Sequence, residues 1–342
     1  MGGTKFGIFT ASLAAVLLMG SGVGAQTPDE WAKVEAAGRQ EGQLTAYLGI
    51  GTNNGRQVLE AFGAAYGIKV DILEIPPTEL RERVRTETAA GRRLGDVIIT
   101  GATISNLNGT GQVEKHGPLP NLSKLKPPFA DDGYFIPVAT GGFGILVNTD
   151  LVKAQDEPRS WRDLLDPKWK GKMLIDNPQV NGQGSYTLGV LLEKLGRDFI
   201  EKLLAQDFVV SSQTPVGLRR VGQGEFPLYV GLPFGNLVSL QGLPVKGILP
   251  EEGAPYTARV VGLVARPPHP NAAHLFMNYL LSDAVQTASI AQGSQSVTGR
   301  TSEDVPANMK GLMNVKLLGD LDIPTNDRAV ALFREILGKK NP

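Results

Sequence analysis

Histidine and cysteine, the side chains most often used for nucleophilic or metal-assisted chemistry, are scarce in this chain. Its 342 residues include three histidines and no cysteine. His269 and His274 are five residues apart with Pro270 between them, so they lack the four-residue spacing that places two zinc ligands on one helix face. The absence of cysteine excludes disulfides, thiolate metal sites and cysteine nucleophiles together.

Sequence motifs for catalysis and nucleotide binding are also missing. The chain has no Gly-x-Ser-x-Gly elbow and no phosphate-binding loop that ends in Gly-Lys-Ser/Thr. Residues 49–54 (GIGTNN) begin like a dinucleotide fingerprint but lack its third glycine. We therefore expect no catalytic residues, no cofactor and no metal, and we interpret the chain as a binding protein and not an enzyme.

The remaining polar candidates follow predicted strands. Residues 43–50 (QLTAYLGI) are typical of a buried strand and run directly into Gly51-Thr52-Asn53. Val58, Ala61, Phe62 and Ala65 have the spacing of one helix face, and Gly67 is a suitable C-terminal cap.

This order of elements continues along the first hundred residues. Residues 68–72 alternate as a strand, a second helix begins near residue 78 and ends at Gly91, and residues 96–100 form a short strand. Strand–helix alternation builds a parallel sheet, and ligands of such sheets lie beyond the carboxyl ends of the strands. Residues 49–53 and 100–103 are therefore candidate ligand-binding loops.

The middle of the chain repeats the pattern. Residues 173–175 and 227–231 read as buried strands, and a helix is expected to begin at residue 185. Thr214-Pro215 suits a helix N-cap followed by proline at the first helical position. At this length one hydrophobic core usually divides, so the sequence predicts two α/β lobes of one design.

The N-terminus has the layout of a cleavable secretory signal. Lys5 precedes an apolar run over residues 6–19, and residues 23–25 are small. Cleavage after Ala25 would leave Gln26 first, whereas a lipid anchor needs cysteine there. The mature chain would lose only Lys5 among charged residues, so 34 basic residues become 33 against 34 acidic ones. Such a balance argues against nucleic-acid binding.

Four segments, in order, resemble the extracellular solute-binding family that includes ferric-ion-binding periplasmic proteins. They are residues 144–149 (GILVNT), 161–172 (WRDLLDPKWKGK), 261–264 (VGLV) and 271–282 (NAAHLFMNYLLS). The resemblance implies an α/β chain with the type 2 periplasmic binding protein fold, in which two lobes joined by two crossover strands hold a ligand in their cleft. Lobe closure about such a hinge is stabilised by ligand contacts to both sides.

The resemblance also implies boundaries and partners. We expect a signal peptide over residues 1–25, a discontinuous first lobe over 26–138 and 265–342, and a second lobe with the hinge strands over 139–264. The expected partners are a small-molecule solute and the permease of an ABC transporter in the inner membrane. The protein is expected to be a periplasmic monomer without a lipid anchor. A sensor that presents its closed form to a membrane receptor is the alternative partner class.

The expected ligand is a small polar organic anion. Ferric binders of this family use two consecutive tyrosines from the second lobe, and Pro233 and Phe234 stand at that place. Without phenolates a hard cation loses its strongest ligands; a ferric ion or iron chelate remains the alternative. Hydroxyls, amides and helix starts suit an oxyanion, and Arg259 matches a carboxylate or phosphonate bidentately.

The expected ligand-binding residues come from both lobes and the hinge. They are Thr52, Asn53, Thr100, Gly101, Ala102, Thr140, Gly141, Ser185, Tyr186, Thr187, Thr214, Phe234, Asn236 and Arg259. Structural alternatives remain open at this stage. Ser185 and Thr214 also suit helix capping, Phe234 and Tyr186 suit core packing, and Arg259 suits a surface position or an interlobe ion pair.

Overall fold

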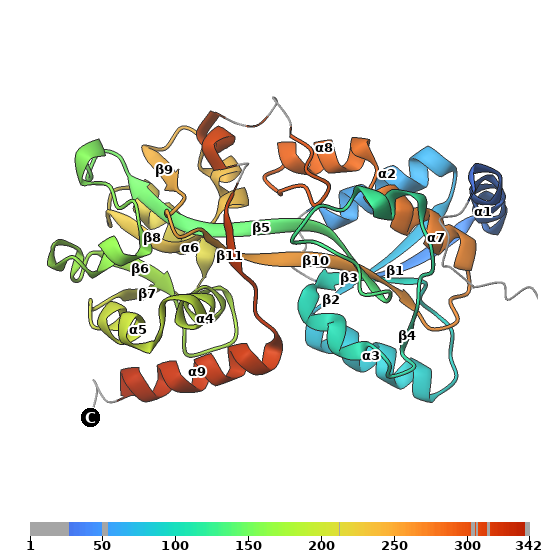
Figure 1. Cartoon of the computed structure of the whole chain (residues 1–342), viewed down its shortest axis with the longest axis horizontal. Helices are drawn as coiled ribbons and strands as arrows, with labels where there is room; N and C mark the ends of the chain where they lie inside the picture. Colours follow the sequence, from blue (N-terminus) through green and yellow to red (C-terminus); the bar gives the residue numbers. More distant parts are fainter. Residues whose placement is uncertain are drawn as a thin grey trace, which may run out of the picture.

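The computed structural model describes residues 27–49, 54–211, 213–301, 305, 307–312 and 315–338. Within them the chain forms two α/β lobes that lie side by side, connected by two long strands (Figure 1). No helix of the described residues is long and apolar enough to cross a membrane. The predicted signal segment, residues 1–25, lies outside the described residues.

The first lobe begins with the predicted alternation of strands and helices. Its elements are α1 (Pro28–Glu41), β1 (Gln43–Gly49), α2 (Gly55–Tyr66), β2 (Lys69–Ile75), α3 (Pro77–Ala89), β3 (Val97–Gly101), η1 (Ala102–Leu107), β4 (Val113–Glu114) and η2 (Pro120–Lys124). Strand β1 pairs in parallel with both β2 and β3, which confirms the expected parallel sheet. Thr27 and Glu30 form a capping box at the start of α1.

The second lobe repeats this design around another short parallel sheet. Its elements are η3 (Ala154–Asp156), η4 (Trp161–Leu165), η5 (Pro167–Trp169), β6 (Met173–Asp176), α4 (Gln183–Leu195), α5 (Arg197–Leu204), β7 (Val209–Ser211), α6 (Thr214–Gly222), β8 (Leu228–Pro233), η6 (Phe234–Leu240) and β9 (Val245–Ile248). Strand β6 pairs in parallel with β7 and β8. Helix α6 begins at Thr214, one residue before the predicted first helical residue Pro215, and its N-cap is Gln213. Helix α4 begins two residues before the predicted Ser185.

Two antiparallel strands, β5 (Phe135–Asn148) and β10 (Ala254–Val264), belong to both lobes. The strand order β2-β1-β3-β10-β5-β8-β6-β7 runs through them without a break, which confirms two crossover strands. The Thr140 hydroxyl donates to the Thr257 carbonyl at 2.9 Å, so it ties β5 to β10 midway between the lobes. Residues 144–149 and 261–264, the predicted crossovers, are the ends of these longer strands.

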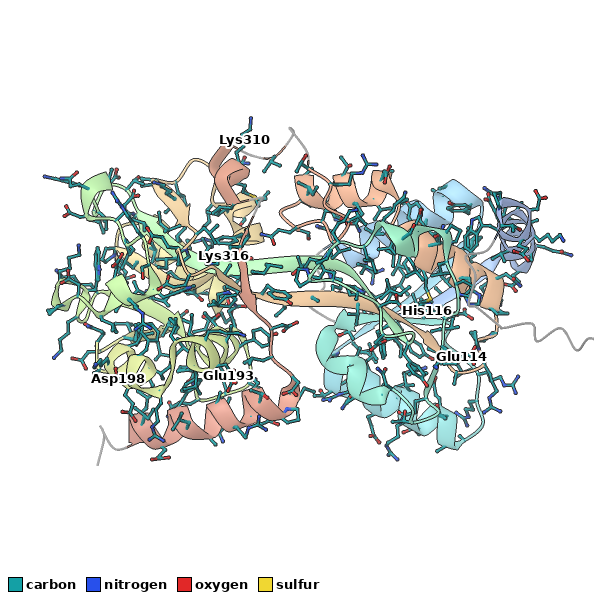
Figure 2. All side chains as sticks on the ribbon, viewed as in Figure 1. Glu114, His116, Glu193, Asp198, Lys310 and Lys316 are labelled. Atoms are coloured by element: carbon teal, nitrogen blue, oxygen red, sulfur yellow. The ribbon has the colours of Figure 1, made fainter. Side chains whose placement is uncertain are left out.

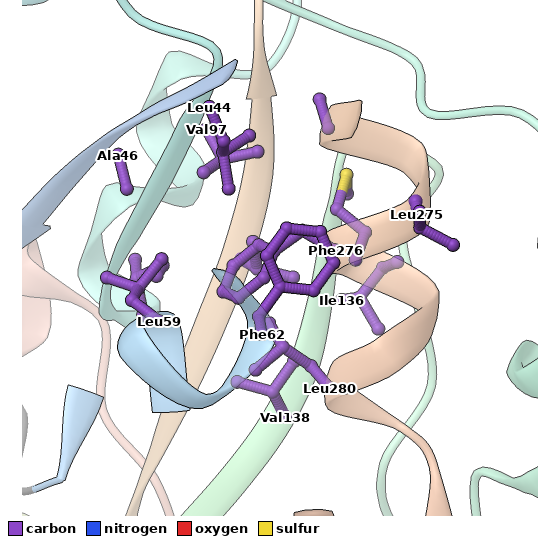
Figure 3. Packing of buried hydrophobic residues seen from close by; sticks show 14 of the residues in the cluster. Leu44, Ala46, Leu59, Phe62, Val97, Ile136, Val138, Leu275, Phe276 and Leu280 are labelled. Atoms are coloured by element: carbon purple, nitrogen blue, oxygen red, sulfur yellow. The ribbon is translucent and has the colours of Figure 1, made fainter. Parts of the chain in front are cut away.

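Each lobe has its own hydrophobic core. In the first lobe, Phe62 and Phe276 meet edge to face with their ring centroids 5.0 Å apart, and they pack with Leu44 and Val97 (Figure 3). In the second lobe, Trp161 is fully buried and its indole N–H donates to the Gly253 carbonyl at 2.9 Å. Burial of apolar side chains contributes roughly 25 cal/mol per Å², so each lobe is stabilised mainly from within.

The C-terminal segment returns to the second lobe. Its elements are α7 (Pro270–Leu280), α8 (Asp283–Ala291), η7 (Ala307–Leu312), β11 (Leu317–Gly319) and α9 (Ile323–Gly338). Helices α7 and α8 lie on the first lobe, but α9 packs beside α4, and its Ala329 and Phe333 join the second-lobe core (Figure 1). The expected assignment of all of 265–342 to the first lobe is therefore wrong for two elements. The apolar face of α9 completes the second lobe, and Met309 and Leu312 of η7 share a core cluster with Leu237 of η6.

Candidate functional site

A cavity of about 700 Å³ lies between the lobes where β5 and β10 cross. Nine of the predicted ligand-binding residues line it. They are Thr100, Gly101, Thr140, Gly141, Tyr186, Thr214, Phe234, Asn236 and Arg259. These residues come from β3, the two hinge strands and the starts of α4, α6 and η6, so the carboxyl ends of strands in both lobes meet at one cavity. This is the arrangement expected for open α/β sheets.

Two other predicted residues are structural. Ser185 is fully buried, and its hydroxyl accepts from the Gly182 amide at 3.1 Å and donates to the Gly182 carbonyl at 3.0 Å. Thr187 is also fully buried, and its hydroxyl accepts from the Gln183 amide at 3.3 Å. Neither lines the cavity. Both predictions are wrong because α4 begins two residues early and turns these hydroxyls inward.

Three predicted residues are only partly covered by the structure. Thr52 and Asn53 fall outside the described residues, and for Ala102 only the backbone at the start of η1 is described. Gly49, the last residue of β1, lies beside Thr100, since an added Cβ on Gly49 would lie 2.4 Å from Thr100 Oγ1. These three residues stay predictions.

Arg259 is the only charged side chain among the described residues that line the cavity. It lies on β10 between Gly101 of β3 and Ala139 of β5. Burial lowers the pKa of its guanidinium to about 10. Within the described part of the chain no hydrogen bond or ion pair satisfies it, so the interlobe ion pair considered above is not found among these residues. A buried cation without a partner is costly unless an anion joins it.

Aromatic rings form one side of the cavity. Tyr186 and Phe143 meet edge to face with ring centroids 6.2 Å apart, and the Tyr186 hydroxyl accepts from the Leu321 amide at 2.9 Å. Phe234 is almost completely buried, and an added Cβ on Gly144 would lie 2.5 Å from its ring. Phe234 therefore packs against the hinge strand and also lines the cavity.

Sequence reasoning missed several cavity residues. They include Phe143, Gln183, Gly235, Gln292, Ser294 and Asn326. Gln183 stands two positions before the predicted helix start, so a more accurate N-terminus would have identified it. Asn326 belongs to α9, and only the return of α9 to the second lobe brings it to the cavity.

A metal centre finds no support in the described residues. None of their His, Asp and Glu side chains gather in groups of three that could hold a metal ion. Pro233 and Phe234, at the place of the expected tyrosine pair, supply no oxygen ligands from their side chains. His116 lies in the first lobe beside Glu114 (Figure 2), outside the residues that line the cavity.

Comparison with known proteins agrees with this architecture. A family model described as "Bacterial extracellular solute-binding protein" matches residues 96–316. A putative 2-aminoethylphosphonate-binding periplasmic protein of Salmonella typhimurium is 27% identical over 272 residues, which cover 72% of this chain and 76% of that protein. An uncharacterized Haemophilus influenzae protein is 29% identical over 199 residues, and these cover 54% of this chain and only 57% of the relative's length.

Solved structures share the fold. Iron-bound HitA from Pseudomonas aeruginosa superposes with a TM-score of 0.69 at 21% identity, covering 86% of this chain and 99% of that one. The periplasmic binding protein AfuA from Actinobacillus pleuropneumoniae, with fructose-6-phosphate bound, superposes with a TM-score of 0.65 at 20% identity, covering 86% and 98%. At such identities the likeness establishes the type 2 periplasmic binding protein fold and leaves the ligand open.

Proposed function

Because this chain belongs to the family of bacterial extracellular solute-binding proteins, we propose that it binds a small organic anion in the interlobe cavity and delivers it to the permease of an ABC-type uptake transporter. The observation that carries the choice of an anion is Arg259, a buried guanidinium without a protein partner among the described residues. A carboxylate, phosphonate or phosphate ester matches its planar donors.

The cavity wall supports an organic ligand and not a bare ion. Tyr186, Phe143 and Phe234 offer apolar surface, which fits the carbon skeleton of an organic molecule. Relatives differ in what their names state, since one is named for 2-aminoethylphosphonate and a structural neighbour holds fructose-6-phosphate. Both of these compounds combine an acidic phosphorus group with a polar organic part. Family members bind solutes and do not transform them, so no turnover is expected.

Ferric iron is the second candidate, supported by the likeness to iron-bound HitA. The described residues supply neither a tyrosine pair at Pro233 and Phe234 nor a cluster of acidic and histidine side chains. Fe³⁺ prefers such hard, charged ligands. The cavity chemistry therefore favours the anion.

A thermal-shift screen tests this proposal. Binding to the native state raises the melting temperature by mass action, so small carboxylates, phosphonates and phosphate esters should raise it while ferric citrate does not. Arg259→Gln should abolish the shift, and Arg162→Gln, which removes an exposed cation at η4 of the second lobe, should leave it intact. A ferric complex that survives excess citrate, together with no response to any acid, would sink the proposal.

A further inference from the structure

The second-lobe side of the cavity has a hydrogen-bonding bias that the anion at Arg259 does not explain. Gln183, Thr214 and Asn326 line it at the first turns of α4, α6 and α9. We call Gln183 and Thr214 the acceptor wall, because the side-chain donors of both are already engaged inside the protein, as the following contacts show. Asn326 borders this wall.

Gln183 has its amide nitrogen turned away from any ligand. This nitrogen donates to the Gly231 carbonyl at 3.3 Å and to the Thr187 hydroxyl at 3.3 Å. A carbonyl can only accept a hydrogen bond, so the orientation of the amide is fixed. The Gln183 carbonyl oxygen is what remains for a ligand, and it is an acceptor.

Asn326 is also fixed, by a chain of amides. Its nitrogen donates to the Asn181 side-chain oxygen at 3.1 Å, and the Asn181 nitrogen donates to the Asp327 carboxylate at 2.9 Å. An ionised carboxylate only accepts, so both amides are oriented from that end. This uses one of the two Asn326 N–H groups. The Asn326 side-chain oxygen is buried beside Gly189 of α4 and has no hydrogen-bond partner within the described chain, so it does not face the cavity.

Thr214 donates its hydroxyl proton to the Asp176 carboxylate. A hydroxyl has one proton, so Thr214 can only accept from a ligand. Asp176 is buried behind it at the end of β6, where the Tyr229 hydroxyl is its neighbour. No described cation pairs with Asp176. The negative charge of Asp176 also contributes, after burial, to a raised pKa of the neighbouring Tyr229 hydroxyl.

These contacts change the role expected of this wall. The sequence predicted that Thr214 and the start of α4 hold an oxyanion, but an oxyanion beside Thr214 would meet lone pairs and the charge of Asp176. Peptide N–H groups in the first turn of α4 are donors that remain there, although Ser185 already occupies the Gly182 amide. Asn236 lines both this cavity and a neighbouring one of about 510 Å³.

These hydrogen-bond directions, together with the proposed function on which this inference rests, suggest a ligand that carries both charges. We propose that the ligand is a short zwitterion whose acid group binds Arg259 and whose ammonium group faces the acceptor wall, with Asp176 behind that wall. An ammonium has three donors and no acceptor, which suits the side-chain oxygens of Gln183 and Thr214. Its positive charge complements a buried carboxylate that lacks a cation. A hydroxyl in the same place would satisfy the acceptors but not the charge.

Calorimetry on the mature protein with two matched series tests the proposal. The first series is 2-aminoethylphosphonate, 2-hydroxyethylphosphonate and ethylphosphonate, and the second is 3-aminopropanoate, 3-hydroxypropanoate and propanoate. In the series whose acid group fits Arg259, the amino compound should bind at least about tenfold more tightly than the unsubstituted acid, with the hydroxy compound between them. Asp176→Asn should weaken the amino compound by about tenfold and leave the unsubstituted acid nearly unchanged.

The control is Asp198→Asn, which removes a carboxylate from the surface of the same lobe (Figure 2) and should change no affinity. Equal binding of amino and unsubstituted acids would overturn the zwitterion while the proposed function stands. An equal loss for both in Asp176→Asn would reduce Asp176 to a structural role and overturn its part in recognition. Failure of all six compounds to bind would overturn the inference and the short anionic ligand together. The ligand series needs no variant, so poor folding of Asp176→Asn leaves it decisive.

Discussion

Gly235 and Gly293 touch backbone to backbone across the mouth of the cleft. Gly235 is the second residue of η6 in the second lobe, and Gly293 follows α8 of the first lobe in a left-handed conformation with φ of 86°. An added Cβ on Gly293 would lie 2.6 Å from the Gly235 Cα, and one on Gly235 would lie 3.2 Å from the Gly293 carbonyl oxygen. Only two glycines allow the lobes to approach this closely.

Gly235→Ala should hold the lobes slightly apart. Gly235 does not have a positive φ, so alanine fits the local backbone conformation there. Its added methyl group strains only the contact with Gly293. We expect the melting temperature of the ligand-free protein to change by less than about 2 °C and ligand affinity to fall roughly threefold to tenfold, since closure contributes to binding. Gly311→Ala, where an added Cβ meets no neighbour within 4 Å, is the matched control. Unchanged affinity in Gly235→Ala would show that closure does not need this contact.

Arg259→Gln should separate binding from stability. Loss of the guanidinium should weaken an organic anion by about 100-fold or more. The same change removes a desolvated cation without a described partner, so the ligand-free protein should melt about 1–3 °C higher. A lower melting temperature would mean that Arg259 stabilises the hinge and has a structural partner.

The pH dependence of anion binding should follow the same side chain. Burial lowers the pKa of Arg259 to about 10, so the cation is lost as the pH rises through that value. A bound anion favours the protonated form and raises this pKa. Binding through Arg259 should therefore be constant from pH 7 to 9 and weaken above about pH 10, which calorimetry in a pH series checks. A similar loss of affinity at high pH in Arg259→Gln would show that another group causes the pH dependence.

The parallel sheet and the cavity position could be predicted from the sequence because both depend on local patterns. Apolar runs such as residues 43–49 become β1, and the loops that follow parallel strands meet at one edge. Thr100 was placed beside the cavity in this way, whereas Thr214 came from the pattern of a helix start and from the family resemblance. Arg259 came from a family resemblance, and its lack of a partner became visible only when the neighbouring strands β3 and β5 were placed beside it.

The bias of the acceptor wall could not be predicted. Thr214 was recognised as a cap or an anion contact, but its proton goes to Asp176, which lies 38 residues earlier in the chain. Asn326 reaches the cavity on α9. The pattern of an amphipathic helix predicts that its apolar face is buried, but it does not indicate against which lobe. Hydrogen-bond direction depends on long-range contacts of this kind, which residue type and spacing do not encode.

Asp320 should make the protein more stable in mild acid. Burial raises the pKa of this carboxyl to about 6 from 3.8, even though the Leu321 and Ala258 amides bind it. The folded state therefore holds a proton between about pH 4 and 6 that the unfolded state releases. Stability contributed by this group falls as the pH rises through that window. Asp320→Asn should raise the free energy of unfolding at pH 7 by about 1–3 kcal/mol. It should also reduce the increase in the free energy of unfolding that the wild-type protein shows when the pH falls from 7 to 5.

Urea unfolding at pH 5 and 7 measures this effect. Asp198→Asn, an exposed carboxylate paired only with Lys202 four residues on, is the control and should change stability by less than about 0.5 kcal/mol. If Asp320→Asn lowers stability at pH 7, the two amide contacts outweigh the desolvation of the charge, and the pKa of Asp320 is not raised.

The position of α9 predicts where a core mutation near the C-terminus acts. Phe333 is fully buried in the second-lobe core with Trp161 and Leu188, so Phe333→Ala should lower the free energy of unfolding by about 3–5 kcal/mol. Hydrogen exchange should then increase in α4 and α5 and stay nearly unchanged in α1 and α7, because the cores are separate. Leu59→Ala, in the first-lobe core, should give the opposite pattern. Because α9 also carries Asn326, a looser α9 should weaken ligand binding as well. Equal hydrogen exchange in both lobes after Phe333→Ala would instead show that the two lobes unfold as one unit.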